Sequence, residues 1–290
     1  MRVSIVIPNW NGKERLRRNL PKVLDVVGVD EIIVVDVGST DGSVQILEKE
    51  FPQIKVIKRY KNSGFSSTVN LGVKESKGGL VFLLNSDAIP DKNCLKHTLM
   101  HFDNPRVFSV GFNTGGSWSW AKFEDGYFWH FQSKEKTMKT HETLWASGGS
   151  GVFRKDIWEN LGGLDELFDP FYEEDLDLGY RATKRGYINL WEPKALVEHG
   201  KTKGVIEENF SSSSVSEVAQ RNQLLFIWKN ITSDKLQRIH QIALVKKLIL
   251  NPLYWKIFLS AFIKNNEIQK KRMIEKRQEV ISDEEILKKY

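Results

Sequence analysis

The chain of 290 residues has one cysteine, Cys94, and lacks any uncharged apolar run of the ~18 residues that a membrane-spanning helix needs. A single thiol excludes an internal disulfide and a zinc site built from cysteines, so we expect a reducing compartment. Residues 1–7 already have a strand pattern, with no apolar signal region before them. These absences together predict a protein on the cytoplasmic side of the membrane.

The net charge is +6, and the surplus of cations gathers toward the end of the chain. From Lys235 to Lys289, many lysines and arginines are interleaved with isoleucine, leucine, phenylalanine and tryptophan. Such a surplus can serve solubility, an anionic membrane surface or a phosphorylated ligand. No nucleic-acid-binding motif accompanies it, so we expect no nucleic acid among the partners.

The first hundred residues alternate between strand and helix patterns, which predicts parallel strands joined by right-handed crossovers. The fold class is therefore α/β, with a mostly parallel, Rossmann-like sheet flanked by helices. We expect Asp41 or Ser43 to cap the second helix. The predicted strands cover residues 3–7, 31–35, 55–58 and 81–84, and the predicted helices cover residues 13–26, 43–51, 65–74 and 91–102.

Residues 113–144 are rich in aromatic side chains and show no clear periodicity. They predict either an irregular segment that contacts a ligand or a small core beneath a long loop. The serines at 211–214 predict a short flexible stretch, and the end of the chain predicts a charged, frayed helix. Further helices are expected at residues 153–161, 174–185, 217–228 and 236–264.

Residues 236–264 combine apolar side chains at helical spacing with flanking cations, and Pro252 is expected to divide them into two helices. This pattern is typical of a helix that lies in a membrane interface, here the inner face of the cell membrane. The alternative is a pair of helices that packs on the rest of the protein or on a partner subunit. Both readings stay open from the sequence.

Two acidic residues follow predicted strands directly. Asp36 comes after residues 31–35, and Asp87 comes shortly after residues 81–84. Open α/β sheets bind ligands at this edge, and a buried carboxylate there needs a cation or another partner. A divalent cation, Mg²⁺ or Mn²⁺, would join Asp87 to a diphosphate. Asp36 could accept a hydrogen bond from a base or ribose. In the alternative interpretation, Asp36 and Asp41 merely cap turns.

Four segments in this order are similar to the successive motifs of family 2 glycosyltransferases. They are residues 3–12, 35–43, 62–65 and 84–87. The resemblance is strongest to the rhamnosyltransferase-like branch that builds bacterial surface polysaccharides. It implies the GT-A fold over residues 1–230, with a nucleotide-binding half at about 1–112, an acceptor half with the catalytic base at 113–230, and a basic helical extension at 231–290.

The resemblance also implies a nucleotide-diphosphate sugar as donor and a divalent cation as cofactor. Asp87 matches the metal-binding acid of the family's Asp-x-Asp motif, and Asn85 replaces the first acid. His199 falls in a motif linked to the metal or the diphosphate. The residues expected to bind the nucleotide are Pro8, Asn9, Asn11, Asp36, Gly38, Ser39, Asn62, Gly64, Asn85 and Ser86.

Inverting transfer needs a carboxylate to take the proton from the acceptor hydroxyl. Glu174-Asp175 matches the family's Glu-Asp pair before a helix, which makes Asp175 the expected base and Glu174 its rival. Trp145, Gly148 and Gly149 match a small-residue loop beneath the donor and acceptor sugars.

The expected function is the transfer of a sugar, with dTDP-rhamnose as one candidate donor, to a glycan or lipid-linked acceptor. Two other classes are a sugar nucleotidyltransferase and a non-catalytic carbohydrate-binding homologue. The first would need a basic Gly-rich loop near the N-terminus, which residues 9–12 do not provide. The presence of both Asp87 and Asp175 argues against the second.

Overall fold

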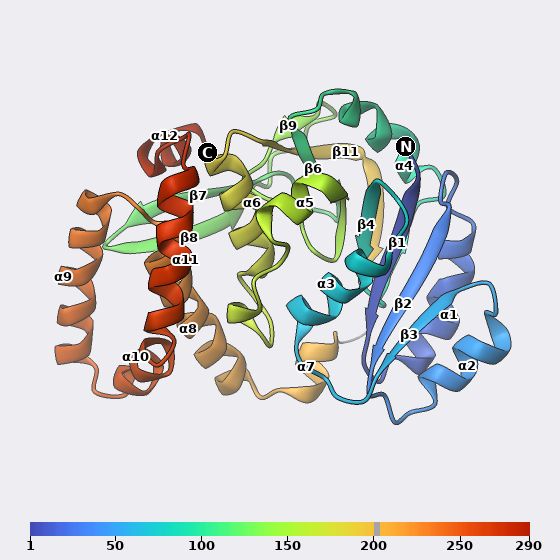
Figure 1. Cartoon of the computed structure of the whole chain (residues 1–290), viewed down its shortest axis with the longest axis horizontal. Helices are drawn as coiled ribbons and strands as arrows, with labels where there is room; N and C mark the ends of the chain where they lie inside the picture. Colours follow the sequence, from blue (N-terminus) through green and yellow to red (C-terminus); the bar gives the residue numbers. More distant parts are fainter. Residues whose placement is uncertain (200–203) are drawn as a thin grey trace.

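A central sheet runs through the computed structural model, which describes residues 1–199 and 204–290 (Figure 1). Its strands follow the order β3-β2-β1-β4-β10-β6-β11-β5, and the short β9 pairs with β11. The first four strands are parallel, and β6 is parallel to β11. The predicted α/β class with a mostly parallel sheet is confirmed. The strands are β1 Val3–Asn9, β2 Glu31–Val37, β3 Lys55–Arg59, β4 Leu80–Leu84, β5 Ala88–Pro90, β6 Val107–Asn113, β9 His141–Glu142, β10 Ser150–Arg154 and β11 Ile188–His199.

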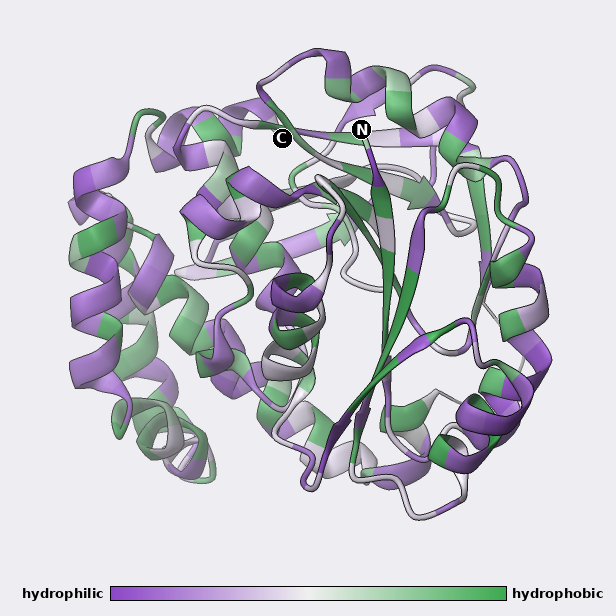
Figure 2. Ribbon diagram, turned by 45° about the vertical axis from the view of Figure 1, so that its right-hand side comes forward, coloured by the Kyte–Doolittle hydropathy of each residue, from purple (hydrophilic) through white to green (hydrophobic). Residues whose placement is uncertain are grey.

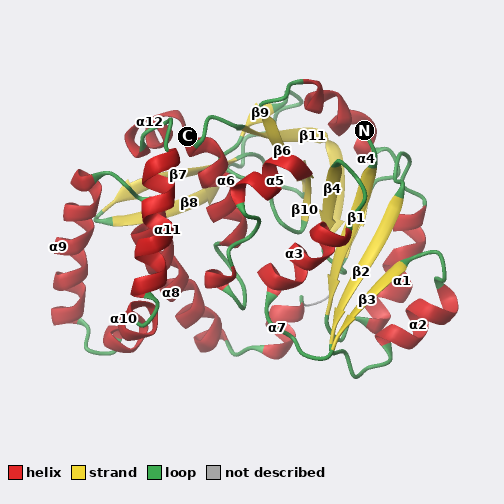
Figure 3. Cartoon of the chain, in the orientation of Figure 1, coloured by secondary structure: helices red, strands yellow, loops and turns green. Residues whose placement is uncertain are grey.

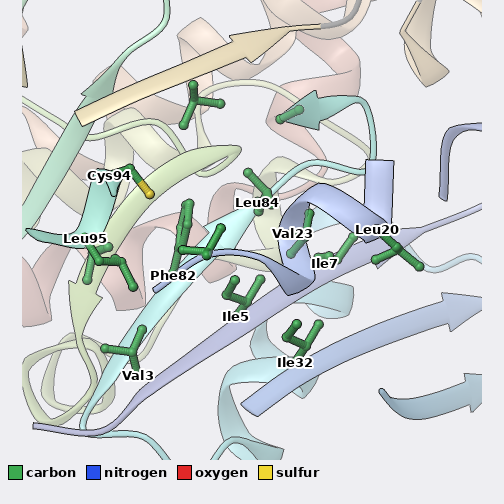
Figure 4. Close-up of a cluster of buried hydrophobic side chains, with 14 of the residues drawn as sticks. Val3, Ile5, Ile7, Leu20, Val23, Ile32, Phe82, Leu84, Cys94 and Leu95 are labelled. Carbon is green, nitrogen blue, oxygen red and sulfur yellow. The ribbon is translucent and has the colours of Figure 1, made fainter. Parts of the chain in front are cut away.

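Helices cover both faces of this sheet (Figure 3). Because side chains alternate along a strand, Ile5 and Ile7 of β1 enter one apolar layer and Val6 enters the other. Figure 4 shows part of the first layer, where Phe82 lies near Ile5 and Leu20 lies near Ile7. Helices α1 Lys13–Leu24, α2 Ser43–Glu50 and α4 Cys94–Thr98 contribute to the first layer, and α3 Phe65–Glu75, α5 Lys155–Leu161 and α6 Glu174–Lys184 contribute to the second.

A third apolar cluster joins the later helices to a two-stranded hairpin. The predicted division at Pro252 is confirmed, since one helix ends at Leu250 and the next begins at Tyr254. Figure 1 places α9 at the edge of the molecule farthest from α2. The elements of this region are β7 Ser119–Glu124, β8 Tyr127–Gln132, α7 Val205–Asn209, α8 Ser212–Asn230, α9 Asp234–Leu250, α10 Tyr254–Phe262, α11 Asn265–Gln278 and α12 Asp283–Lys289.

The aromatic segment at 113–144 is more regular than the sequence indicated. Its strands β7 and β8 pair as an antiparallel hairpin joined by Asp125 and Gly126, which both have positive φ. An Asp-Gly pair between two strands is a strong hairpin signal, because both residues tolerate that conformation. Trp120 stacks on its cross-strand partner Phe131. The expectation of an irregular segment was therefore wrong for residues 119–132.

Three smaller expectations were also wrong. Residues 150–154, including Phe153, form a buried strand between β4 and β6, and α5 begins only at Lys155. Ser211 caps α8, so the serines after it belong to the helix's first turn. The N-cap of α2 is Gly42, while Asp41 accepts from the backbone N–H of Ser43. Short apolar runs and serine runs do not by themselves distinguish a strand, a helix start and a loop.

The end of the chain is anchored instead of frayed. Helix α12 begins with a capping box formed by Ser282 and Glu285. Asp283 is fully buried, where it accepts from the Tyr180 hydroxyl at 2.6 Å and pairs with Lys184 at 2.9 Å. A buried carboxylate with these partners fixes the last helix to α6.

Asp177 pairs with Arg181, which lies four residues later in α6, and the pair belongs to a larger buried cluster. Asp177 is fully buried and accepts from Arg181 Nε at 2.8 Å, Lys229 Nζ at 2.6 Å and Asn230 Nδ2 at 2.8 Å. Lys229 also pairs with Asp165 at 2.6 Å. This cluster ties α6 to α8.

Replacing Asp177 with Ala should destabilise the protein strongly, because it leaves Arg181 facing an empty buried position and deprives Lys229 of one carboxylate. Breaking a buried ion pair from one side costs about 3–5 kcal/mol. Thermal denaturation should show a Tm lower by about 10 °C. Glu48→Ala, which breaks an exposed pair with Lys58, is the matched control and should change Tm little. Equal Tm values for the two variants would contradict this account.

Candidate active site

A cleft of about 530 Å³ opens at the carboxyl ends of β1, β2 and β4. Parallel strands deliver their following loops to one edge of the sheet, which is where open α/β sheets bind ligands. Most of the residues predicted for the site line this one cleft. They are Pro8, Asn9, Asn62, Gly64, Asn85, Ser86, Asp87, Gly148, Gly149, Glu174 and Asp175.

Four further predicted residues lie behind the cleft wall and hold it in place. Asp36 is 2% exposed and accepts from Asn9 Nδ2 at 2.7 Å and from the Ser39 backbone N–H at 3.1 Å. Asn11 joins the same network through its backbone N–H, which donates to Ser39 Oγ at 2.8 Å. Gly38 has positive φ, and a Cβ on it would lie 2.8 Å from the Tyr60 carbonyl oxygen. The network fixes the loops after β1 and β2 to each other.

The loop after β4 contacts the small-residue loop at 147–149 directly. The backbone N–H of Asn85 donates to the Gly149 carbonyl at 3.0 Å. A Cβ on Gly149 would lie 2.3 Å from Asn85 Nδ2, so that any larger residue would displace the Asn85 side chain from its position on the cleft floor. The two loops therefore form one continuous floor of the cleft.

Asp87 lies at the tight turn between β4 and β5 and lines the cleft. Gly204, which precedes α7, comes close to it, since a Cβ there would be 3.7 Å from Asp87 Oδ2. No group of three or more His, Cys, Asp or Glu within residues 1–199 and 204–290 could hold a metal ion as a protein cage. A hard cation that shares its shell with phosphate and water needs only one or two carboxylates, so Asp87 fits that use. The side chain of His199, the other predicted metal residue, lies outside the described part; its backbone ends β11.

Glu174 and Asp175 open α6 at the opposite wall of the cleft. Asp175 accepts from the backbone N–H of Gly148 at 3.2 Å and from that of Leu176 at 2.8 Å. Burial raises the pKa of Asp175, while these two backbone donors lower it. Burial and then the charge of Asp175 raise the pKa of Glu174 well above its ordinary value. A carboxylate whose pKa is raised toward neutrality is suited to accepting a proton.

Glu174 has an unusual environment for a carboxyl group. It is 7% exposed, and its Oε2 has no hydrogen-bond partner within the described residues. A buried polar atom without a partner costs free energy, and such atoms gather at functional sites. Glu174 therefore offers a hydrogen-bonding group to a ligand in the cleft.

The turn before Glu174 is strained. Tyr172 and Glu173 have φ of 72° and 74°, which non-glycine residues rarely adopt, at a cost of roughly 1–3 kcal/mol each. Asn222 of α8 holds this turn, because its Nδ2 donates to the carbonyls of Phe168, Phe171 and Tyr172 at 2.7–2.9 Å. No sequence pattern pointed to Asn222, which stands between Arg221 and Gln223 and has no local signal that distinguishes it from the other polar residues of α8.

A second cavity, of about 320 Å³, lies on the other side of Asp175. The predicted sugar-contacting residue Trp145 lines this second cavity instead of the cleft. His130 of β8 lies there too, and its Nε2 is 3.3 Å from Glu173 Oε1. Burial lowers the pKa of His130, but the hydrogen bond and charge of Glu173 raise it further, to above its ordinary value. No sequence motif had indicated a role for His130.

Comparisons with known proteins find relatives in sequence and in fold. An N-acetylglucosaminyl-diphospho-decaprenol L-rhamnosyltransferase of Mycobacterium tuberculosis is 24% identical over 59% of this chain and 66% of its own. The structure is similar to GalNAc-T7 with UDP, GalNAc and Mn²⁺, at a TM-score of 0.68, 14% identity and coverage of 88% of this chain and 57% of that one. It is also similar to a mannosyltransferase of Pyrobaculum calidifontis in complex with GDP-Man and Mn²⁺, at a TM-score of 0.57, 14% identity and coverage of 96% and 84%.

The expected GT-A fold is confirmed by these structures. The chain spans 24–43% of the length of the first four curated relatives that it matches. The family model described as glycosyl transferase family 2 matches residues 4–162, which is more than half of the 290 residues. The chain belongs to glycosyltransferase family 2.

Proposed function

We propose that this chain transfers a sugar, with inversion at the anomeric carbon, from a nucleotide-diphosphate sugar to a hydroxyl group of a glycan or lipid-linked acceptor. One observation carries the proposal: the loops that follow β1, β2 and β4 share a single cleft with the half-buried carboxylate of Asp175. Loops at this edge of the sheet can bind a nucleotide, and the carboxylate can take a proton from an acceptor hydroxyl.

In this mechanism the donor's nucleotide lies against the loops after β1 and β2, held by Pro8 and Asn9, with Asp36 and Ser39 supporting them. The diphosphate reaches toward Asn85 and Ser86. Asp175 takes the proton from the acceptor hydroxyl as its oxygen bonds to the anomeric carbon. The bond from that carbon to the diphosphate breaks on the opposite face, and the nucleotide diphosphate leaves.

Asp87, together with His199, would hold a divalent cation against the donor diphosphate. When bound, Mn²⁺ or Mg²⁺ supplies positive charge that neutralises the phosphate oxygens and the leaving group. Similar structures that contain UDP or GDP-Man with Mn²⁺ support this assignment. Because one of the relatives is a rhamnosyltransferase, dTDP-rhamnose is one of the donors to test.

A nucleotide-release assay tests the proposed function against its rivals. Incubation with dTDP-, UDP- or GDP-sugars and Mn²⁺ should release the nucleoside diphosphate from at least one donor, slowly with water and faster with an acceptor glycan. A nucleotidyltransferase would instead release pyrophosphate from a nucleoside triphosphate and a sugar 1-phosphate. A non-catalytic homologue would bind a sugar and release nothing.

The C-terminal helices carry an exposed apolar face that we propose docks on an anionic membrane surface. The face is formed by Ile239, Ile242, Val245, Ile249, Leu250, Leu253, Trp255, Leu259, Phe262 and Ile263, all of them exposed. In Figure 2, α10 is coloured mostly hydrophobic. No helix in the described ranges 1–199 and 204–290 could cross a membrane.

Charge argues for a bilayer as the occupant of this face. Residues 235–266 contain no Asp or Glu, and Lys235, Arg238 and Lys246 are exposed along the same helix as Ile242 and Ile249. Each such cation near anionic lipid contributes about 1 kcal/mol. Figure 1 shows the loop between α9 and α10 along the same lower edge as α7, which borders the cleft. A lipid-linked acceptor would meet the cleft there.

Substituting both Ile242 and Ile249 with Ser should weaken binding to vesicles of phosphatidylcholine and phosphatidylglycerol at least about tenfold, because two inserted side chains are lost. Co-sedimentation at low salt measures this. Ile274→Ser, an exposed apolar position on α11, is the matched control and should bind as the wild type does. A wild type that stays in the supernatant would contradict the proposal. So would a self-association, detected by sedimentation velocity, that the double variant abolishes, because the face would then bind a second copy.

A further inference from the structure

The second cavity beside Asp175 has a lining that describes the ligand it can bind. It lies between the hairpin strand β8, the loop at 143–147 and β11. Two residues, Ser147 and Asp175, line both this cavity and the donor cleft. A molecule in the second cavity would therefore meet the donor at the proposed base.

Trp191 gives the cavity wall an unused hydrogen-bond donor. Its side chain is 5% exposed, and its Nε1–H has no partner among residues 1–199 and 204–290. A buried donor of this kind costs free energy unless a ligand or water satisfies it. An oxygen-bearing ligand in the cavity would provide the missing acceptor.

The rest of the lining describes the ligand's chemistry. Hydroxyl and amide groups come from Thr114, Ser119, Gln132 and neighbouring side chains, and aromatic surface comes from Phe131 and Trp145. Aromatic faces and hydroxyl groups together are what a sugar ring requires. Within the described lining, the ionisable groups are Asp175 and His130, with no Lys or Arg. A phosphate would lack the cations that usually bind it.

We propose that this cavity binds the acceptor as an uncharged sugar ring, so that an acceptor hydroxyl points at Asp175. This inference rests on the proposed function, since it assigns the acceptor class of the same reaction. With this assignment, the aromatic hairpin both contacts a ligand and forms part of a core. Phe128 and Tyr127 are buried in the core, while His130 and Phe131 face the cavity.

Saturation-transfer NMR on the full chain tests the proposal with methyl glycosides of glucose, galactose, mannose, N-acetylglucosamine and rhamnose, with inorganic phosphate and glucose 1-phosphate as charged competitors. At least one methyl glycoside should bind, and the phosphates should not displace it. Trp191→Phe keeps the ring but removes the donor, so its Kd should rise about three- to tenfold. Thr114→Trp should fill the cavity and abolish the signal.

Trp129→Phe is the matched control, because Trp129 lies on the same hairpin outside the cavity and its Nε1 donates to the Glu124 carbonyl. It should bind glycosides as the wild type does. No binding of any methyl glycoside, or binding that Trp191→Phe leaves unchanged, would overturn the proposal. Mn²⁺-dependent binding of UDP, dTDP or GDP, measured in parallel, separates this failure from a failure of the proposed function.

Discussion

The Asp175→Asn variant should bind the donor normally and transfer its sugar about 10²–10⁴-fold more slowly than the wild type, the usual cost of losing a positioned base. Asparagine keeps the shape of aspartate, and its Oδ1 can still accept from the Leu176 backbone N–H. The loss therefore falls on the chemical step. Single-turnover transfer, with donor affinity measured separately by calorimetry, distinguishes kcat from binding.

Glu174→Gln is the control for this result, because Glu174 is the neighbouring buried acid. It should change donor affinity more than the transfer step. If Glu174→Gln costs more in kcat than Asp175→Asn, the two roles are exchanged. The pH profile gives a further check: only the ionised carboxylate accepts a proton. Because burial raises the pKa of Asp175, kcat in the wild type should rise with pH through that raised pKa, and Asp175→Asn should lose this dependence.

Asp87→Ala should abolish the part of nucleotide binding that depends on Mn²⁺, a loss of at least about 100-fold in affinity with the metal present. Asp87 lines the cleft at the turn after β4, where a cation between the carboxylate and a diphosphate would offset the repulsion between their negative charges. Calorimetric titration of UDP, dTDP or GDP with Mn²⁺ and with EDTA measures the effect.

Asp91→Ala is the matched control for that experiment, since Asp91 is exposed and lies outside the cleft. It should bind nucleotide as the wild type does. Nucleotide affinity that is the same in Asp87→Ala and the wild type, with Mn²⁺ present, would refute the metal assignment. Circular dichroism of each variant separates a lost ligand from a lost fold.

The fold of the first hundred residues was predictable because its signals are local. Each buried strand is a short apolar run, and each helix between strands shows the 3.6-residue period. The four predicted strands agree with β1 to β4 within two residues at each end. The Asp125-Gly126 turn was an equally local signal, and it was overlooked because the aromatic residues around it obscured the period-2 pattern.

The parts that could not be predicted depend on contacts between distant segments. Asn222 supports the strained turn before Glu174 from 50–54 residues away in sequence, and no spacing rule reveals this pairing. Trp191 becomes informative only when the structure shows its Nε1–H buried without a partner. The candidate cleft residues were anticipated from motifs, whereas the second cavity is lined by β8, β11 and the loop at 143–147, which only the folded chain brings together.

Thermal denaturation with a panel of dTDP-, UDP- and GDP-sugars, each with Mn²⁺ and with EDTA, tests the central claim most directly. A ligand that binds only the folded state at 100 times its Kd stabilises it by about 2.7 kcal/mol, or roughly 5 °C in Tm. The account predicts such a shift for at least one nucleotide sugar with Mn²⁺ and a much smaller one with EDTA. No shift with any nucleotide sugar, or a shift that EDTA leaves unchanged, would contradict it.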